Sequence, residues 1–305
     1  MKRILLFLAI CFFLTGFAAA QSDQIKYAII PENPQPGEPV TIGAAGGINR
    51  AILISGGKRL ASAGFFVVPA SGTDPSFVAA ILTIPSTADP GAAVIRLEGA
   101  AGDVEIPLII AHREFVSEVI HLNPVLTGIR TEPDPQKTAE SNRLSAILGT
   151  VGNEIYCTGT FIPPVSATRR TSFYGDRRVF QYSNGGRDTS IHAGVDFGVP
   201  TGTQVVSCGP GRVVLAAMRI VTGNSVVIEH LPGVYSIYYH LSTIRVREGD
   251  IVDRGILLGQ VGSTGLATGP HLHWELRVNW ENTDPDFWTT RPILDKKEIL
   301  SRIGN

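Results

Sequence analysis

The sequence is poor in cysteine and nearly balanced in charge. Its 305 residues include three cysteines, and the formal net charge is −1 at pH 7. A balance this close to zero gives no indication of a nucleic-acid-binding surface or of a polybasic membrane patch. No histidine lies at metal-ligand spacing from Cys157 or Cys208, so neither is a candidate nucleophile or metal ligand. A His-Glu-x-x-His motif is also absent, which excludes the helical metalloprotease type that carries its own carboxylate base.

An apolar run of notable length occurs only near the start of the chain. Lys2 and Arg3 form a basic beginning, Ile4–Phe17 an apolar run, and Ala18–Ala20 a small-residue cleavage site. This order is typical of a secretory signal peptide over residues 1–20, and the run is short for a membrane span. An uncleaved anchor is the alternative. We therefore expect an exported protein of the periplasm or cell envelope, with no transmembrane span in its mature form.

Export bears on the two cysteines that remain after cleavage. An oxidising compartment permits a disulfide between Cys157 and Cys208. The two residues lie in different segments, so the sequence leaves open whether they pair. The oligomeric state is likewise left open.

Composition and turn spacing predict a mostly β protein of two domains. Apolar residues make up 44% and charged residues 17%, and the 33 glycines and 20 prolines are scattered. Seven short strands between residues 21 and 114 predict an antiparallel β-sandwich, whose Pro-rich start resembles bacterial immunoglobulin-like modules. Their expected bounds are Ile25–Ile30, Pro39–Ala44, Ala51–Ser55, Gly64–Val68, Phe77–Ile84, Ala93–Glu98 and Val104–Ile110.

The rest of the chain divides into a connector, a second β domain and a tail. Residues 115–160 are the expected connector, with a helix that Asp134 and Pro135 begin and Gly149 ends. Residues 161–290 return to strands and tight turns, and we expect an antiparallel sheet there. Residues 291–305 form the expected tail, with a short helix within Ile293–Ile303.

Two histidines follow a glycine-rich loop at the period of a strand. His271, His273 and Glu275 are two residues apart, so on a strand they share one face. The residues between them are apolar and share the other face. A helix would separate the two imidazoles by roughly 200°. A pair of surface histidines is the plain alternative, but the pattern is also that of a metal-centred site.

Two further segments supply compatible side chains. His192 and Asp196 lie four residues apart, and Gly194 and Gly198 argue for a bent strand rather than a helix there. A histidine and a carboxylate beside a glycine turn can both ligate a metal, or they can form a simple hydrogen-bonded pair. In the third segment, Tyr238 and His240 share one face of a predicted strand. Nitrogen and oxygen ligands without thiolate suit zinc and do not exclude other divalent ions.

These three segments resemble the signatures of the lysostaphin/LytM-type zinc peptidases, which are murein hydrolases. The motifs are His192-Ala193-Gly194-Val195-Asp196, Tyr238-Tyr239-His240 and His271-Leu272-His273, and the likeness extends over about Ser172 to Asp284. The resemblance implies an antiparallel peptidase domain of the LytM, or duplicated hybrid motif, type. It also implies one Zn²⁺ per chain and a peptide of peptidoglycan as the substrate. The bond that is cut stays open among cross-links, glycine bridges and other wall peptide bonds, and we favour a cross-link because the chain has the features of a bacterial periplasmic protein.

The resemblance assigns a role to each matching residue. His192, Asp196 and His273 would ligate the metal, His271 would be the general base, and His240 would stabilise the oxyanion. As lesser candidates, the substrate groove would be lined by Asn224, Tyr238 and Thr264. A carboxylate should orient one of the ligand histidines from behind.

Three rival hypotheses remain open at this level. The chain could be a catalytically silent relative that activates other hydrolases, or a wall-binding adaptor that works through its first domain. It could also be an enzyme whose groove is masked by the connector or by the loop Phe173–Arg177.

Overall fold

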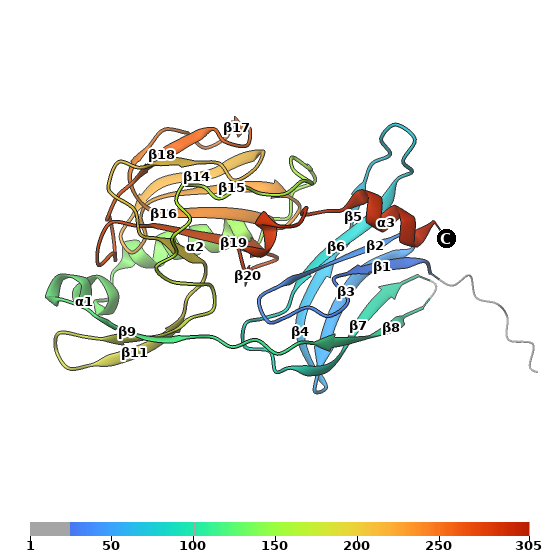
Figure 1. Ribbon diagram of the computed structural model, residues 1–305, viewed down its shortest axis with the longest axis horizontal. Coiled ribbons are helices and arrows are strands. Elements are labelled where there is room, and N and C mark those ends of the chain that lie inside the picture. Colours follow the sequence, from blue (N-terminus) through green and yellow to red (C-terminus); the bar gives the residue numbers. More distant parts are fainter. Residues whose placement is uncertain (1–24, 101, 305) are drawn as a thin grey trace, which may run out of the picture.

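The computed structural model of the chain describes residues 25–100 and 102–304, and it is elongated, with two β-rich lobes end to end (Figure 1). The predicted signal peptide lies outside the described residues. Within the described part, no helix has both the length and the apolar character needed to cross a membrane. The prediction of a mostly β protein built from antiparallel sheets is confirmed, with one parallel pair as an exception.

Two four-stranded antiparallel sheets build the first lobe and enclose one apolar core. Val40 and Ile42 of one sheet and Leu53 and Ile95 of the other are fully buried between them. An immunoglobulin-like topology stays a prediction. The first sheet has the order β1 (Tyr27–Ile30), β2 (Pro39–Ala44), β6 (Phe77–Thr83), β5 (Phe66–Val68). The second has the order β4 (Lys58–Gly64), β3 (Ile48–Ser55), β7 (Gly91–Gly99), β8 (Val104–Ile110).

Strand β4 was missing from the expected set. It is an edge strand that begins with two exposed cations, and Ala63 is its one buried residue. A strand with so little apolar alternation gives no period-2 signal, although charged residues on edge strands are common because they discourage aggregation. The strand expected over Gly64–Val68 is correspondingly shorter and spans Phe66–Val68.

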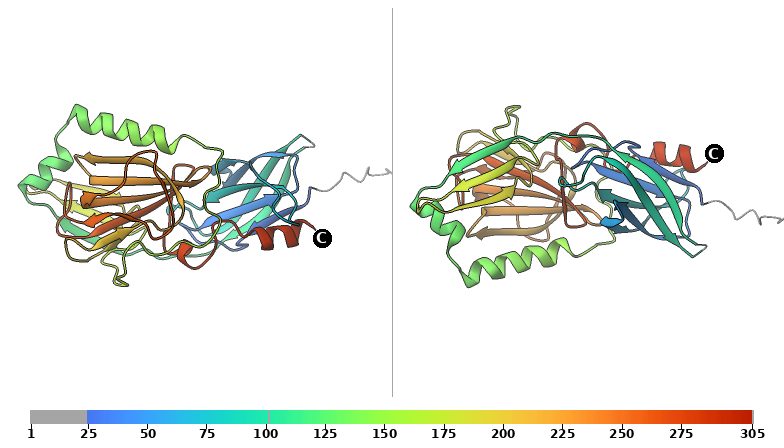
Figure 2. Two further views of the ribbon diagram at one scale, coloured as in Figure 1. Left: turned by 90° about the horizontal axis from the view of Figure 1, so that it is seen from above. Right: turned by 90° about the horizontal axis from the view of Figure 1, so that it is seen from below.

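The connector contains a strand and two helices, of which only the second helix was expected. That helix is α2 (Pro135–Leu148), with Asp134 as its N-cap and Gly149 as its C-cap. It covers the outer face of the large sheet (Figure 2), where Leu144 and Leu148 pack in one apolar cluster. The other helix, α1 (Pro124–Thr131), begins with the same kind of signal, because Asn123 accepts a hydrogen bond from the Leu126 amide.

The second lobe is built on one nine-stranded sheet. Its path is β12-β19-β16-β15-β14-β17, with β13, β18 and β20 attached at its margins. The strands are β12 (Val195–Phe197), β13 (Gln204–Val206), β14 (Gly211–Arg219), β15 (Gly223–Leu231), β16 (Val234–Ile244), β17 (Ile251–Val252), β18 (Leu257–Val261), β19 (Leu272–Val278) and β20 (Glu281–Thr283).

A smaller three-stranded sheet stands against this large sheet. Its order is β11 (Arg187–Ile191), β10 (Arg177–Gln181), β9 (Ser117–His121). The β9–β10 pair is parallel, which differs from the antiparallel arrangement expected for the domain. The difference arises because β9 belongs to the connector and enters this sheet from outside the segment that the motifs define.

The chain returns to the first lobe at its end. After the 3₁₀ turn Phe287–Thr289, helix α3 (Lys296–Ile303) packs beside β1 and β2 (Figure 1). Asp295 caps it by accepting a hydrogen bond from the Glu298 amide, so the helix begins three residues later than the first residue of the expected range. Ile299 and Ile303 are its buried side chains.

Both cysteines are buried free thiols in the core of the second lobe. Burial raises the pKa of Cys157, and it raises the pKa of Cys208 to about 12. Neither thiol ionises near neutral pH, and both lie away from solvent. The structure shows no disulfide between them, and a buried thiol with a raised pKa is a poor nucleophile.

His230 lies in the same core and makes stability depend on pH. Its ring is fully buried between Pro210 O and Ser236 Oγ, each 2.7 Å away, and burial lowers its pKa from 6.5 to about 4. As the pH falls, the imidazole of the unfolded chain is protonated near pH 6.5, whereas that of the folded protein stays neutral until about pH 4. Protonation therefore favours the unfolded chain, and the free energy of unfolding decreases as the pH falls from about 6.5 toward 4.

We expect His230→Gln to remove this share of the pH dependence. Between pH 7 and pH 5 the variant should lose about 2 kcal/mol less unfolding free energy than the wild type. Urea unfolding of both proteins at the two pH values measures the difference. An identical loss in both proteins would show that His230 carries no such linkage.

Candidate metal centre

Three neighbouring strands place Asp196, His273 and Tyr239 in one row. Asp196 of β12 is opposite His273 of β19, and His273 is opposite Tyr239 of β16. Gly194 allows this approach, because a Cβ there would lie 2.1 Å from the backbone oxygen of Trp274. The glycine within the His192–Asp196 motif is therefore required by the packing of β12 on β19.

The side chains of His192, Asp196 and His273 converge. His273 Nδ1 lies 2.7 Å from Asp196 Oδ1 and 3.0 Å from His192 Nε2, and the last atom is 3.2 Å from Asp196 Oδ1. All three residues are buried, and among the described residues they are the group able to hold a metal ion. Ligand atoms on a tetrahedral zinc, with bonds near 2.0–2.2 Å, stand about 3.3 Å apart. The donor set and its spacing fit a divalent metal.

The outer nitrogen of each ligand histidine is already engaged. His192 Nδ1 lies 2.8 Å from the Phe173 carbonyl oxygen, and His273 Nε2 lies 3.0 Å from Glu275 Oε1. The Phe173 carbonyl and the Glu275 carboxylate can only accept hydrogen bonds, so the outer nitrogen of each ring carries the proton. The inner nitrogens, His192 Nε2 and His273 Nδ1, therefore direct their lone pairs toward each other and toward Asp196. Three electron-rich atoms at this distance need a cation among them.

The pKa values of the three clustered residues are shifted by burial and by one another's charges. Burial opposes charge on both groups, yet the neighbouring carboxylates raise the pKa of His273 to about 9, and the two imidazoles hold the pKa of Asp196 well below 3.8. Burial lowers the pKa of His192. The surroundings of His273 therefore favour a positive charge beside Asp196 and Glu275.

Glu275 is the orienting carboxylate that the sequence could not identify. Its Oε2 accepts hydrogen bonds from Arg277 Nε at 2.9 Å and from Asn282 Nδ2 at 3.2 Å, while its Oε1 holds His273. Burial works against ionisation, but Arg277 and His273 outweigh it and lower the pKa of Glu275. The strand pattern placed Glu275 on the face of His271 and His273, which is the signal that could have found it.

His240 and His271 flank the cluster with their rings 4.7 Å apart. His240 has a φ of 63° and lies in a β-bulge, where Tyr239 and His240 together face Ser225 alone. A bulge changes the direction of the side chains within it, and here it turns both Tyr239 and His240 toward the cleft. His240 Nδ1 lies 2.8 Å from Thr264 O, and His271 Nδ1 lies 2.8 Å from Gly269 O. His271 Nε2 is 3.9 Å from Asp196 Oδ1.

The structure corrects the expected groove. Tyr238 is fully buried and its hydroxyl accepts from the Cys208 amide, because the bulge shifts the alternation by one residue. Tyr239 lines the cleft instead and stacks on His273 at 5.6 Å. Asn224 and Thr264 are not among the lining residues. Asn224 Nδ2 donates to Leu241 O, and Thr264 holds His240, so both shape the site from behind.

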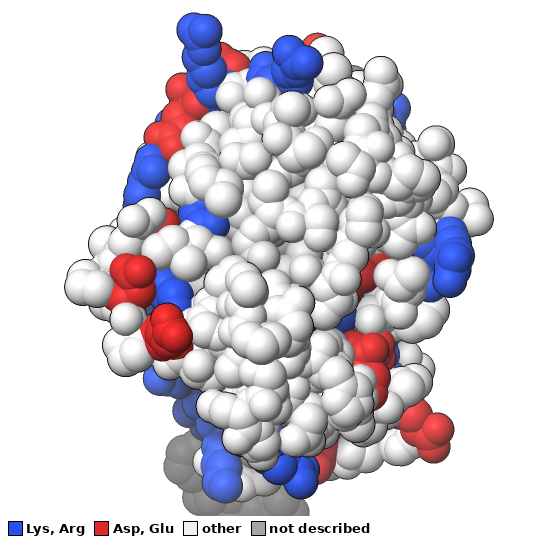
Figure 3. All heavy atoms as spheres, turned by 90° about the vertical axis from the view of Figure 1, so that its left-hand side faces the viewer, with Lys and Arg blue, Asp and Glu red and all other residues white. Residues whose placement is uncertain are grey.

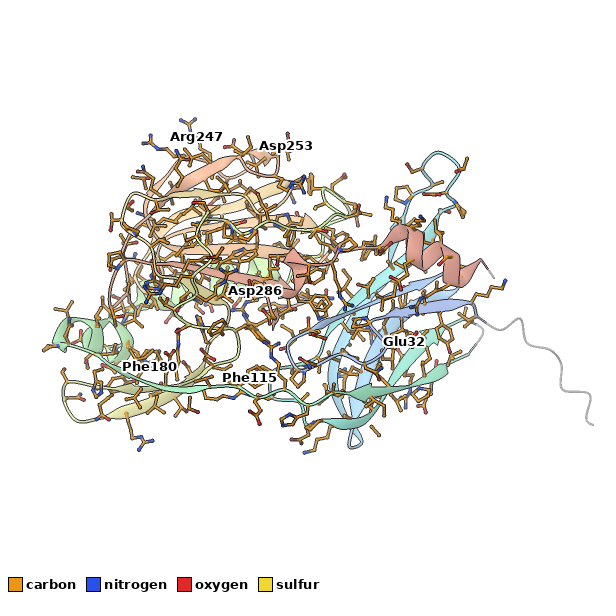
Figure 4. The ribbon with its side chains drawn as sticks, viewed as in Figure 1. Glu32, Phe115, Phe180, Arg247, Asp253 and Asp286 are labelled. Atoms are coloured by element: carbon orange, nitrogen blue, oxygen red, sulfur yellow. The ribbon has the colours of Figure 1, made fainter. Side chains whose placement is uncertain are left out.

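The cluster opens into a cleft of about 540 Å³. Its far wall is the inner face of the three-stranded sheet, with Glu118, Ile120, Arg178 and Phe180. Phe180 can be found on that sheet beside α1 (Figure 4). The connector therefore forms one side of the cleft. At the end of this lobe, charged side chains are sparse across the middle of the surface and gather toward its rim (Figure 3).

Part of the chain resembles known peptidases. The family model described as peptidase family M23 matches residues 190–285, a range that includes all five histidine and aspartate candidates. The peptidoglycan DD-endopeptidase ShyA of Vibrio cholerae is 40% identical over 116 residues, which are 38% of this chain and 26% of ShyA. The chain covers less than a third of the length of the curated relatives compared.

Solved structures give a similar result. A protein from Pseudomonas aeruginosa assigned to peptidase M23 has a TM-score of 0.60 and 25% identity, and the match covers 84% of this chain and 94% of that one. The catalytic domain of lysostaphin from Staphylococcus simulans is 31% identical, with 40% of this chain and 92% of that domain covered, at a TM-score of 0.35. The chain therefore contains a peptidase family M23 domain, and the matched residues 190–285 include the His192, Asp196 and His273 cluster.

Proposed function

We propose that the chain is an exported zinc metalloendopeptidase that cleaves peptide cross-links of bacterial peptidoglycan. The observation that carries the proposal is the convergence of two imidazole nitrogens and one carboxylate oxygen within 3.2 Å at the floor of an open cleft. The name of ShyA as a peptidoglycan DD-endopeptidase supports the substrate class. We also propose the domain bounds expected above, with residues 161–290 as the peptidase domain.

In this proposal, His192 Nε2, Asp196 Oδ1 and His273 Nδ1 hold one Zn²⁺. Zinc, when bound, supplies Lewis acidity and lowers the pKa of coordinated water toward 7. The hydrogen bonds from His192 to Phe173 O and from His273 to Glu275 keep the correct nitrogen of each ring turned inward. Tyr239 stacks on His273 and restricts the rotation of that ring.

His271 is the proposed general base. Its Nδ1–H donates to Gly269 O, which leaves Nε2 as the lone pair on the side of Asp196. That nitrogen is placed to accept the proton of the attacking water and to return it to the leaving amine. Its side chain is 18% exposed, so substrate and water can reach it.

His240 is the proposed partner of the developing oxyanion. Its Nδ1–H is committed to Thr264 O, so Nε2 must carry a proton to donate to the substrate oxygen. Burial and the charges of the neighbouring histidines lower the pKa of His240 to about 3, so the resting ring is neutral. The negative charge that grows on the substrate oxygen raises the proton affinity of Nε2, which then takes a proton from a solvent water in the open cleft and shares it with that oxygen.

A catalytically silent activator is the alternative, and it is not favoured. A silent relative is expected to lack ligands, whereas all three proposed ligands and both flanking histidines are together here. A wall-binding role of the first lobe is compatible with the enzyme.

The test is cleavage of a purified cross-linked muropeptide dimer, followed by mass spectrometry of the products. The zinc-loaded protein should convert the dimer to monomers, chelation should stop the reaction, and added zinc should restore it. A correctly folded protein that holds one zinc and leaves the dimer intact would contradict the proposed function.

A further inference from the structure

Arg178 and Glu118 reach the metal cluster from outside the segment that matches family M23. Arg178 lies on β10 and Glu118 on β9, whereas the family model begins at residue 190. The two residues are opposite each other in the parallel β9–β10 pair, and both side chains line the cleft. The neighbours Val119 and Arg177 alternate to the other face of this sheet.

Arg178 links two carboxylates. Its Nη2 lies 2.6 Å from Asp196 Oδ2, and its Nε lies 2.6 Å from Glu118 Oε1. Glu118 is held in turn by Ser172 Oγ, at 3.2 and 3.3 Å from its two oxygens. The side chains of Arg178 and Asp196 are 15% and 9% exposed, so solvent screens their contact little.

This contact divides the two oxygens of Asp196 between two partners. Oδ1 faces His192 and His273, and Oδ2 faces Arg178. A buried carboxylate with one oxygen unpaired is costly, so without Arg178 the group would rotate or turn both oxygens toward the cation. The planar guanidinium can meet both carboxylates at once, which the single ammonium of lysine cannot do.

We propose that Arg178, held by Glu118, is a positioning residue that makes Asp196 offer one oxygen to the metal. The proposal rests on the proposed metal role of His192, Asp196 and His273. It adds that the connector completes the site, since Glu118 belongs to the segment 115–160.

The test compares zinc affinity in three full-length variants, measured by competition with a chromophoric chelator. Arg178→Gln should raise the Kd for zinc about 10- to 100-fold, the usual cost of losing an orienting partner. Glu118→Gln should have a smaller effect, because Arg178 still reaches Asp196. Arg177→Gln is the matched control on the same strand, since Arg177 binds Ser86 and Gly175 and makes no contact with the cluster.

A second readout separates positioning from general loss of structure. In the Co²⁺-substituted protein, Arg178→Gln should change the visible absorption bands, because a second carboxylate oxygen or a water joins the coordination. Arg177→Gln should leave those bands unchanged. If Arg178→Gln does not fold by circular dichroism, Arg178→Lys serves in its place and should show the same change in weaker form.

An Arg178 variant that folds, binds zinc within about threefold of the wild type and keeps the Co²⁺ spectrum would overturn the proposal. The test is independent of turnover. A wild type that binds zinc without hydrolysing muropeptides would contradict the proposed function alone, and the affinity comparison would still decide the role of Arg178.

Discussion

Asp196→Ala is expected to abolish zinc binding and hydrolysis together. The substitution removes the one anionic metal donor. It leaves only His192 Nε2 and His273 Nδ1, 3.0 Å apart, with no carboxylate beside them to balance the charge of a metal ion. Loss of the metal removes several kcal/mol of charge stabilisation, which corresponds to a fall in kcat of at least about 10³-fold. Zinc content per chain and muropeptide turnover are the two measurements.

A matched control guards this result against loss of fold. His121→Ala removes an exposed histidine of β9 and should change neither zinc content nor turnover. Circular dichroism of Asp196→Ala should match the wild type. Full turnover in a folded Asp196→Ala protein would show that Asp196 is not a ligand.

His271→Ala should keep the zinc and lose the rate. His271 Nε2 lies 3.9 Å from Asp196 Oδ1, beyond hydrogen-bond distance, so removal of the ring should leave the three donors in place. Loss of a general base costs typically about 10²- to 10⁴-fold in kcat. His240→Ala should likewise retain zinc and lose about 10²- to 10³-fold, the usual cost of an oxyanion partner.

Zinc content and kcat, measured on the same variant, distinguish a metal ligand from a residue that acts on the substrate. Stoichiometric zinc with a reduced kcat supports the division into ligands and flanking histidines. Loss of zinc from His271→Ala would place that residue among the ligands, and an unchanged kcat would remove it from the reaction.

The motifs could be recognised from the sequence because strand alternation is local. His271, His273 and Glu275 share a face in any strand, and Gly194 marks a close backbone approach that the register of β12 on β19 explains. The positive φ of His240 is not visible in the same way. The bulge depends on how β15 pairs with β16, so alternation assigned Tyr238 to the groove where Tyr239 stands.

The partners of the site depend on long-range packing. Arg178 meets Asp196 only because β9 of the connector joins β10 and β11 into a sheet beside the cleft. Nothing in the spacing of Glu118 and Arg178, sixty residues apart, indicates that pairing. Strand β4 was missed for a different reason, since its exposed, charged start carries no apolar period.

Anomalous diffraction at the zinc edge, on crystals of the zinc-loaded chain, tests the central assignment most directly. The account predicts one anomalous peak per chain, within bonding distance of His192 Nε2, Asp196 Oδ1 and His273 Nδ1. A zinc-loaded crystal with no peak among those three atoms, or with its peak elsewhere in the chain, would contradict it.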